Sequence, residues 1–97
     1  MPVDLVWSCE VAEHIVPERV DFFVDTLANG RVVAMTHALP GQGGHHHVNC
    51  QPAEYWISKM SERGYSLFAG NEMIRQVALG DLPGNYFTKS GLLFLRD

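Results

Sequence analysis

Two carboxylates and an imidazole stand close together near the start of the chain. Glu10, Glu13 and His14 form an E-x-x-E-H motif, and residues three or four apart share one face of a helical turn. Glu10 is therefore expected to lie beside both Glu13 and His14. Carboxylate oxygens and a neutral imidazole are suitable ligands for Mg²⁺, Mn²⁺ or Zn²⁺. The motif thus indicates a candidate site for a divalent metal.

A further ligand for such an ion would have to come from another segment, and His47 is the candidate. It lies in a glycine- and histidine-rich loop that follows a second apolar run. If the two runs are neighbouring parallel strands, the loops after them meet at the same edge of the sheet. His37, at the start of the same loop, is a further polar residue on this side.

The histidines of this loop also raise the alternative of a structural zinc site, formed by His45, His46, His47 and Cys50. Adjacent histidine side chains point in different directions, and structural zinc prefers two pairs of spaced ligands. The other interpretation is an exposed loop without a metal. Both interpretations stay open at the level of sequence.

The elements that position these residues follow from the apolar pattern. Val3–Cys9 is almost continuously apolar, which is typical of a strand buried on both faces. From Pro17 to Ala28 the apolar residues recur at helical spacing, and Asn29-Gly30 ends the helix. Arg31–Thr36 is a second apolar strand. This strand–helix–strand order predicts a βαβ unit with parallel strands.

The second half of the chain is less uniform. A long loop is expected from His37 to Gln51, then a helix over Pro52–Arg63, in which Tyr55 and Trp56 are expected to be core residues rather than a stacking platform. A strand follows over Tyr65–Ala69. The segment from Gly70 to Gly84 is ambiguous: Glu72–Leu79 fits a helical turn or an irregular strand, and Asp81–Gly84 is a turn signal. Asn85–Leu95 is expected to be the last strand.

Composition limits the classes of protein that fit. The chain of 97 residues is expected to form a single domain over residues 1–97. A formal net charge of −4 argues against a general nucleic-acid binder. Two cysteines are too few for a disulfide framework. With neither a signal peptide nor a membrane-spanning run in these residues, we expect a cytoplasmic protein without a membrane partner.

Two segments carry a resemblance to a known family. Asp4–Ile15, with its S-x-E-V-x-E-H-I pattern, resembles the segment around the fourth strand of class I S-adenosylmethionine-dependent methyltransferases of the type 11 and type 23 kinds. Pro40–Gly44, His47–Asn49 and Gln51–Trp56 resemble the loop and helix after the fifth strand. The resemblance implies an α/β fold, with a partial Rossmann-like sheet made of family strands four to seven and flanking helices. It also implies that the last strand inserts antiparallel between the fifth and the sixth.

The resemblance also bears on the metal. The pattern is similar to that of small-RNA 2′-O-methyltransferases and of some quinone-biosynthesis O-methyltransferases, in which such residues hold a metal that positions the acceptor hydroxyl. Glu10, Glu13 and His14 carry over by motif, and His47 by its place before Asn49–Trp56. Many methyltransferases have Glu-His here without a metal, the glutamate capping a helix and the histidine packing under it. That alternative stays open.

On function, the resemblance implies methyl transfer from S-adenosylmethionine to an acceptor nucleophile. These 97 residues contain no glycine-rich cofactor loop, so alone they are expected to be inactive and not to bind S-adenosylmethionine measurably. The chain is then either part of a longer reading frame or half of a split enzyme, with a second chain supplying the missing half. The alternative from a different class is a non-enzymatic binding or oligomerising module.

The strand Val3–Cys9 predicts how the chain assembles. In the family fold one of its neighbours is the first strand, which these residues do not contain. Val3–Cys9 is then a sheet edge that carries Leu5, Val6 and Trp7 without lysine, internal proline or a bulge signal. Such an edge favours pairing with another chain. We therefore expect a homodimer or a higher homo-oligomer through this edge.

Overall fold

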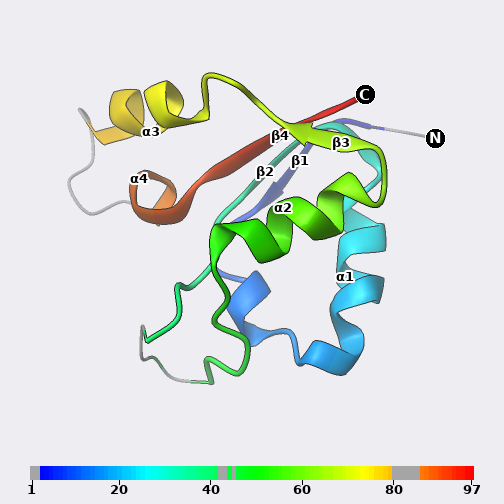
Figure 1. Cartoon of the computed structure of the whole chain (residues 1–97), viewed down its shortest axis with the longest axis vertical. Helices are drawn as coiled ribbons and strands as arrows, with labels where there is room; N and C mark the ends of the chain where they lie inside the picture. Colours follow the sequence, from blue (N-terminus) through cyan, green and yellow to red (C-terminus); the bar gives the residue numbers. More distant parts are fainter. Residues whose placement is uncertain (1–2, 42–43, 45, 80–85) are drawn as a thin grey trace.

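The computed structural model describes residues 3–41, 44, 46–79 and 86–97, and it has alternating strands and helices (Figure 1). Within this part of the chain, no helix has the length and the apolar character needed to cross a membrane. The elements in chain order are β1 (Val3–Ser8), the 3₁₀ turns η1 (Ala12–His14) and η2 (Pro17–Arg19), α1 (Val20–Leu27), β2 (Gly30–Met35), α2 (Ala53–Ser61), β3 (Tyr65–Leu67), α3 (Asn71–Leu79), α4 (Tyr86–Ser90) and β4 (Leu92–Arg96).

The strands form one mixed sheet in the order β1-β2-β4-β3. β1 pairs parallel with β2, which confirms the predicted βαβ unit. β4 lies between β2 and β3 and is antiparallel to both. The insertion of the last strand therefore has the place and the direction that were expected from the resemblance.

One face of the sheet carries the hydrophobic core. Here Val33, Met35 and Phe94 are fully buried. They meet the apolar sides of α1 and α2, and Trp56 of α2 is fully buried, as predicted. α3 and α4 lie together on the opposite side of the sheet from α1 and α2 (Figure 1).

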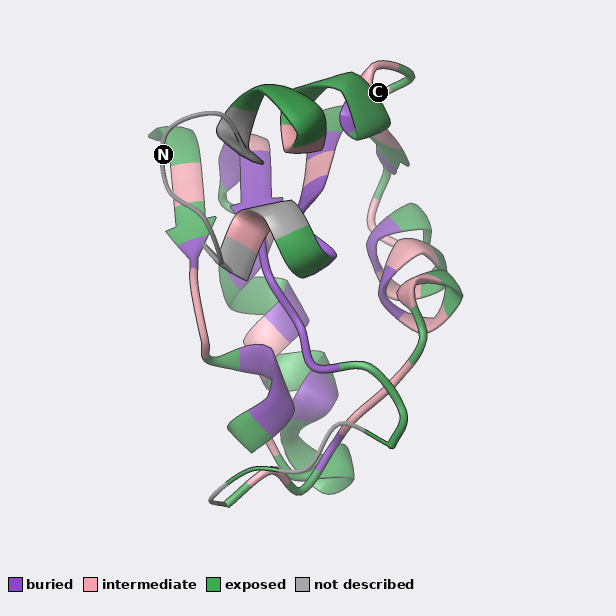
Figure 2. Cartoon of the chain, turned by 90° about the vertical axis from the view of Figure 1, so that its left-hand side faces the viewer, coloured by how far each residue is buried: buried purple, intermediate pink, exposed green. Residues whose placement is uncertain are grey.

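The prediction that β1 is buried on both faces is wrong. Val3, Leu5 and Trp7 are 48%, 57% and 55% exposed, and β1 is visibly more exposed than the central strands (Figure 2). A continuous apolar run shows that both faces of the strand are apolar. The strand is buried only if other segments of the protein pack on each of these faces. Val6 packs against the core. On the face with Leu5 and Trp7, the described residues provide partial cover through the stack of Trp7 with Phe87, at 5.9 Å between ring centroids.

The last predicted strand is also partly wrong. Its first half is the helix α4, and β4 begins only at Leu92; Asn85 lies outside the described residues, as does the predicted turn at Asp81–Gly84. Tertiary contacts explain the helix, because they override weak strand preference. The ring of Phe87 stacks on Trp7, and the hydroxyl of Ser90 accepts the main-chain N–H of His37. In the ambiguous segment before it, the helical alternative is the one observed, as α3.

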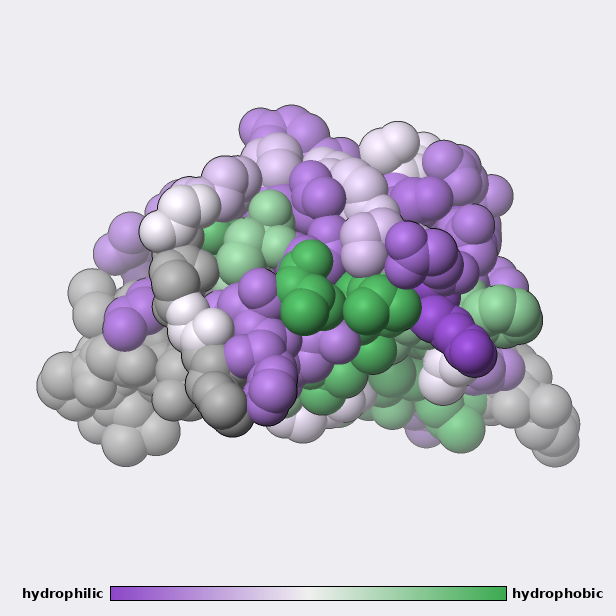
Figure 3. Space-filling model, turned by 90° about the horizontal axis from the view of Figure 1, so that it is seen from below, coloured by the Kyte–Doolittle hydropathy of each residue, from purple (hydrophilic) through white to green (hydrophobic). Residues whose placement is uncertain are grey.

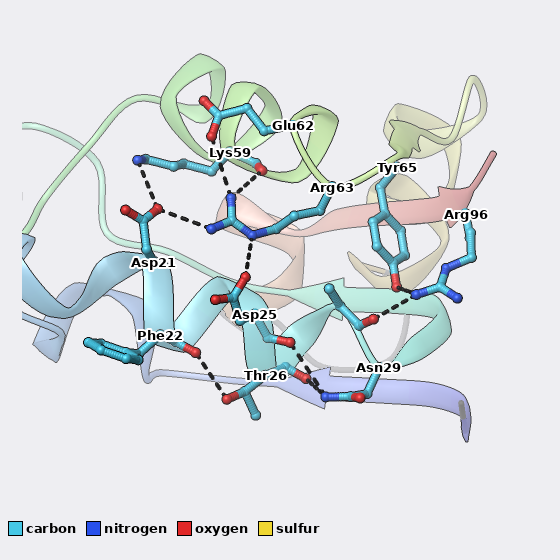
Figure 4. Close-up of polar contacts among 11 residues, drawn as sticks. Asp21, Phe22, Asp25, Thr26, Asn29, Lys59, Glu62, Arg63, Tyr65 and Arg96 are labelled. Atoms are coloured by element: carbon cyan, nitrogen blue, oxygen red, sulfur yellow. Dashed lines mark hydrogen bonds and ion pairs between the residues drawn. The ribbon is translucent and has the colours of Figure 1, made fainter. Parts of the chain in front are cut away.

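Helices α1 and α2 are joined by ion pairs on their outer side (Figure 4). The Arg63 guanidinium donates to Asp25 at 2.9 Å and to Asp21 at 3.1 Å, and Lys59 pairs with Asp21 at 3.2 Å. The hydrogen bonds from Lys59 and Arg63 lower the pKa of the Asp21 carboxyl. These pairs connect one turn of α1 with Lys59 in the last turn of α2 and with Arg63 just beyond the end of that helix.

We predict that Arg63→Ala lowers the free energy of unfolding by about 1 kcal/mol, because the change removes the contacts of one guanidinium with the carboxylates of Asp21, Asp25 and Glu62. Chemical denaturation measures the loss, and added salt should reduce it because ions screen the pairs. Arg19→Ala removes an exposed arginine of η2 and serves as the control. Equal losses in the two variants would contradict a stabilising role for these pairs.

Candidate metal centre

The loop after β1 and the loop after β2 are joined through one main-chain carbonyl. The Glu13 carbonyl oxygen accepts the N–H of Val48 at 2.9 Å and that of Asn49 at 3.0 Å. Parallel pairing of β1 with β2 brings both loops to the same edge of the sheet. Two segments that are distant in sequence therefore lie side by side at the carboxyl ends of neighbouring strands, where ligands bind in open α/β sheets.

The side chain of Glu13 is fully buried at this junction. Neither of its carboxylate oxygens has a hydrogen-bond partner among the described residues. The glutamate therefore does not act as the helix cap that the metal-free interpretation of the motif requires. A buried carboxylate without a partner is strongly unfavourable unless a cation or a proton compensates it.

His14 presents one ring nitrogen to this carboxylate. Its Nδ1 lies 2.9 Å from the carbonyl oxygen of His46. Because a carbonyl can only accept, Nδ1 is the donor in this bond, and in the neutral imidazole Nε2 then carries the lone pair. Nε2 lies 3.6 Å from Oε2 of Glu13. A carbonyl that orients the histidine in this way is a common partner of metal-binding imidazoles.

His47 lies against His14, with ring centroids 5.0 Å apart and an angle of 72° between the rings. Its Nδ1 is buried and has no partner among the described residues. The ring occupies space that Gly44 leaves open, since a Cβ atom at position 44 would lie 2.5 Å from it. Glu13, His14 and His47 each offer one ligand atom, and these atoms lie within 4.8 Å of one another.

Glu10 is not brought into this group. The predicted helical turn that would align it with Glu13 and His14 begins only at Ala12. Glu10 has a φ of 61°, a left-handed conformation that is uncommon outside glycine, and its N–H donates to Oγ1 of Thr36 at 2.9 Å. The chain therefore bends sharply between β1 and η1, which breaks the spacing on which the prediction was based.

The other residues of the predicted site lie around the group. His37 is buried, and its Nδ1 donates to the carbonyl of Gln51 at 3.1 Å. The Gln51 side chain in turn donates to Oδ1 of Asn49. Within the described part of the chain, Cys50 does not join His47 in a ligand group, and His45 lies outside that part. The sequence offered no signal for Thr36 or for the space-making role of Gly44.

Comparisons with family models, with curated proteins and with solved structures found no match for this chain.

The pH dependence of stability follows from His37. Burial lowers its pKa from the ordinary 6.5, opposed by hydrogen bonds with the main chain of Gln51 and Ala38 and by the charge of Glu13; the charge of Arg75 lowers it further. Below 6.5 the unfolded chain binds a proton at this histidine more readily than the folded chain does. The contribution of His37 to stability is therefore complete above that value and is lost as the pH falls.

We predict that His37→Gln flattens the dependence of stability on pH. The free energy of unfolding of the wild type should fall more steeply than that of the variant between about pH 7 and pH 5. Urea titrations across this range measure both slopes. Identical slopes would show that the His37 imidazole does not contribute in the way its burial implies.

Proposed function

We propose that Glu13, His14 and His47 bind a divalent metal on the acceptor side of an S-adenosylmethionine-dependent methyl transfer. The observation that carries the proposal is the fully buried Glu13 carboxylate, which has no hydrogen-bond partner among the described residues and is faced by Nε2 of His14 at 3.6 Å. A divalent cation at this point would compensate the carboxylate and use both imidazole lone pairs. It would also give a partner to Nδ1 of His47, which is buried without one among the described residues.

The donor set fits such an ion. Two histidines and one glutamate are a ligand set with which zinc retains an open coordination position, and the same atoms suit manganese. An ion with an open position can bind a hydroxyl oxygen and make its proton more acidic. The chain's own contribution is orientation: the His46 carbonyl holds the His14 ring, and Gly44 leaves room for the His47 ring.

Methyl transfer is supported by the arrangement of the sheet. The order β1-β2-β4-β3, with only β4 reversed, agrees with family strands four, five, seven and six. In that fold the loops after β1 and β2 face the methyl acceptor, and these are the loops that the Glu13 carbonyl joins. Residues that bind the cofactor would come from outside these strands.

We predict that Mn²⁺ or Zn²⁺ binds the chain and that Glu13→Gln weakens binding at least about tenfold, because the amide carries no charge. Isothermal titration calorimetry measures the affinity, and the metal should also raise the melting temperature of the wild type. Glu54→Gln, an exposed glutamate on α2, is the matched control. His47→Ala should weaken binding as Glu13→Gln does.

Unchanged affinity in both Glu13→Gln and His47→Ala would contradict the site. Glu10→Gln tests whether Glu10 is a ligand, as the motif predicted, although Glu10 lies outside the observed group. A loss as large as that of Glu13→Gln would add Glu10 to the ligands, and normal binding would leave the three-residue set.

For methyl transfer itself, the protein to test is the longest natural polypeptide, or pair of polypeptides, that joins these residues to a glycine-rich cofactor loop. We predict that it releases S-adenosylhomocysteine in the presence of an acceptor and that Glu13→Gln lowers the rate at least about a hundredfold. Glu54→Gln should leave the rate unchanged. If activity persists after removal of the metal by a chelator and in Glu13→Gln, methyl transfer does not require a metal at this site.

A further inference from the structure

The outer edge of β1 presents main-chain groups in a definite pattern. β1 and β2 are in the parallel register Val3↔Gly30, Leu5↔Val32 and Trp7↔Ala34, and the N–H of Val3 donates to the carbonyl of Asn29 at 2.8 Å. In this ladder the main-chain groups of residues 3, 5 and 7 face β2. Those of Asp4 and Val6 therefore face the other way, and within the described residues no strand lies on that side.

The side chains beside this edge are apolar and accessible. Val3, Leu5 and Trp7 share the sheet face opposite the core, and each is about half exposed. Seen from below, the surface of the molecule carries hydrophobic residues next to hydrophilic ones (Figure 3). The one charge on β1, Asp4, is partly compensated by Arg31 at 3.9 Å. β1 contains neither lysine nor proline, two residues that commonly protect sheet edges.

We infer that β1 pairs antiparallel with β1 of a second copy of this chain, about a twofold axis at Leu5. Asp4 of one copy then lies opposite Val6 of the other, and each such pair exchanges both of its main-chain hydrogen bonds. The two sheets become one continuous sheet, and all the outward-facing main-chain groups of Asp4 and Val6 gain partners. This inference concerns the chain by itself, because in the complete methyltransferase sheet of the proposed function the outer edge of β1 would pair with the family's first strand instead.

The axis at Leu5 is favoured because the two neighbouring positions of the twofold axis are less favourable. Moving the axis one residue toward the amino end sets Asp4 against Asp4 of the second copy, and like charges directly opposite each other are destabilising. Moving it one residue the other way sets Asp4 against Ser8, whose carbonyl already accepts the N–H of Thr36 at 2.9 Å. Only the axis at Leu5 avoids both defects.

Side-chain pairing supports the same register. With the axis at Leu5, the two Leu5 side chains meet at a non-hydrogen-bonded position, where side chains approach most closely. Val3 of each copy lies opposite Trp7 of the other, and pairs of an aromatic with a β-branched residue stabilise sheets. The three exposed apolar residues of each copy therefore contact those of the other side by side on the same face of the joined sheet.

Disulfide trapping tests the register, in a background where Cys9 and Cys50 are serine. Opposed Cα atoms at a non-hydrogen-bonded position lie about 4.5 Å apart, within reach of a disulfide. Leu5→Cys should therefore form a covalent dimer under mild oxidation. Val3→Cys, equally exposed but displaced from the axis, should not. Cross-linking of Val3→Cys without cross-linking of Leu5→Cys would overturn the register.

Charge substitution tests the dimer itself by sedimentation equilibrium. Wild type should be dimeric at micromolar concentration, and Leu5→Lys should be monomeric because two ammonium groups would meet at the axis. An equimolar mixture of Leu5→Lys and Leu5→Glu should recover the dimer. Phe22→Lys, a change at an apolar residue of α1 that is 70% exposed, is the control and should stay dimeric. A monomeric wild type, or a dimer that persists in Leu5→Lys, would overturn the inference, and so would a strand of a different chain bound along β1.

Discussion

The two main-chain hydrogen bonds to the Glu13 carbonyl are the constraint on which the candidate site depends. They connect the turn η1 to the loop after β2, and so they place the Glu13 carboxylate, the His14 ring and the His47 ring in one small volume. Without these hydrogen bonds, no main-chain hydrogen bond among the described residues would hold the segment of Glu13 against the segment of His47. The hydrogen bond from His14 to the His46 carbonyl adds a second connection between the same segments. The site is therefore built as much by backbone groups as by the side chains that would bind an ion.

The sequence predicted the elements that have a regular apolar pattern or a simple order along the chain. Helix α1 was readable because Val20, Val24 and Leu27 recur at helical spacing, and they are buried in the structure. The parallel pairing of β1 and β2 followed from the strand–helix–strand order. The apolar pattern does not show which face of a sheet is covered by helices, so the exposure of Leu5 and Trp7 was not predicted. It was equally silent about contacts between distant segments, so the stack of Phe87 on Trp7, which accompanies α4, had no signal in the sequence.

The same division applies to the site. Motif spacing identified Glu13 and His14, and the expected meeting of two loops identified His47. The spacing argument failed at Glu10, because it assumed a regular turn where the chain adopts a left-handed residue. That conformation accompanies a hydrogen bond to Thr36, a residue 26 positions away in the chain. A local pattern cannot contain such information, because the bond forms only once β1 and β2 are paired.

The absence of a side chain at Gly44, which makes room for the His47 ring, affects how this site tolerates sequence change. Gly44 has no part in any proposed ligand set, yet any other residue there would bring an atom to 2.5 Å from the His47 ring. A single-nucleotide change from a glycine to an alanine codon would displace that ring while leaving the identity of all three ligand residues unchanged. The site is thus vulnerable at a position where inspection of the ligands alone would find nothing altered. Variation among natural or engineered versions of this chain should accordingly be read at position 44 as carefully as at the three side chains themselves.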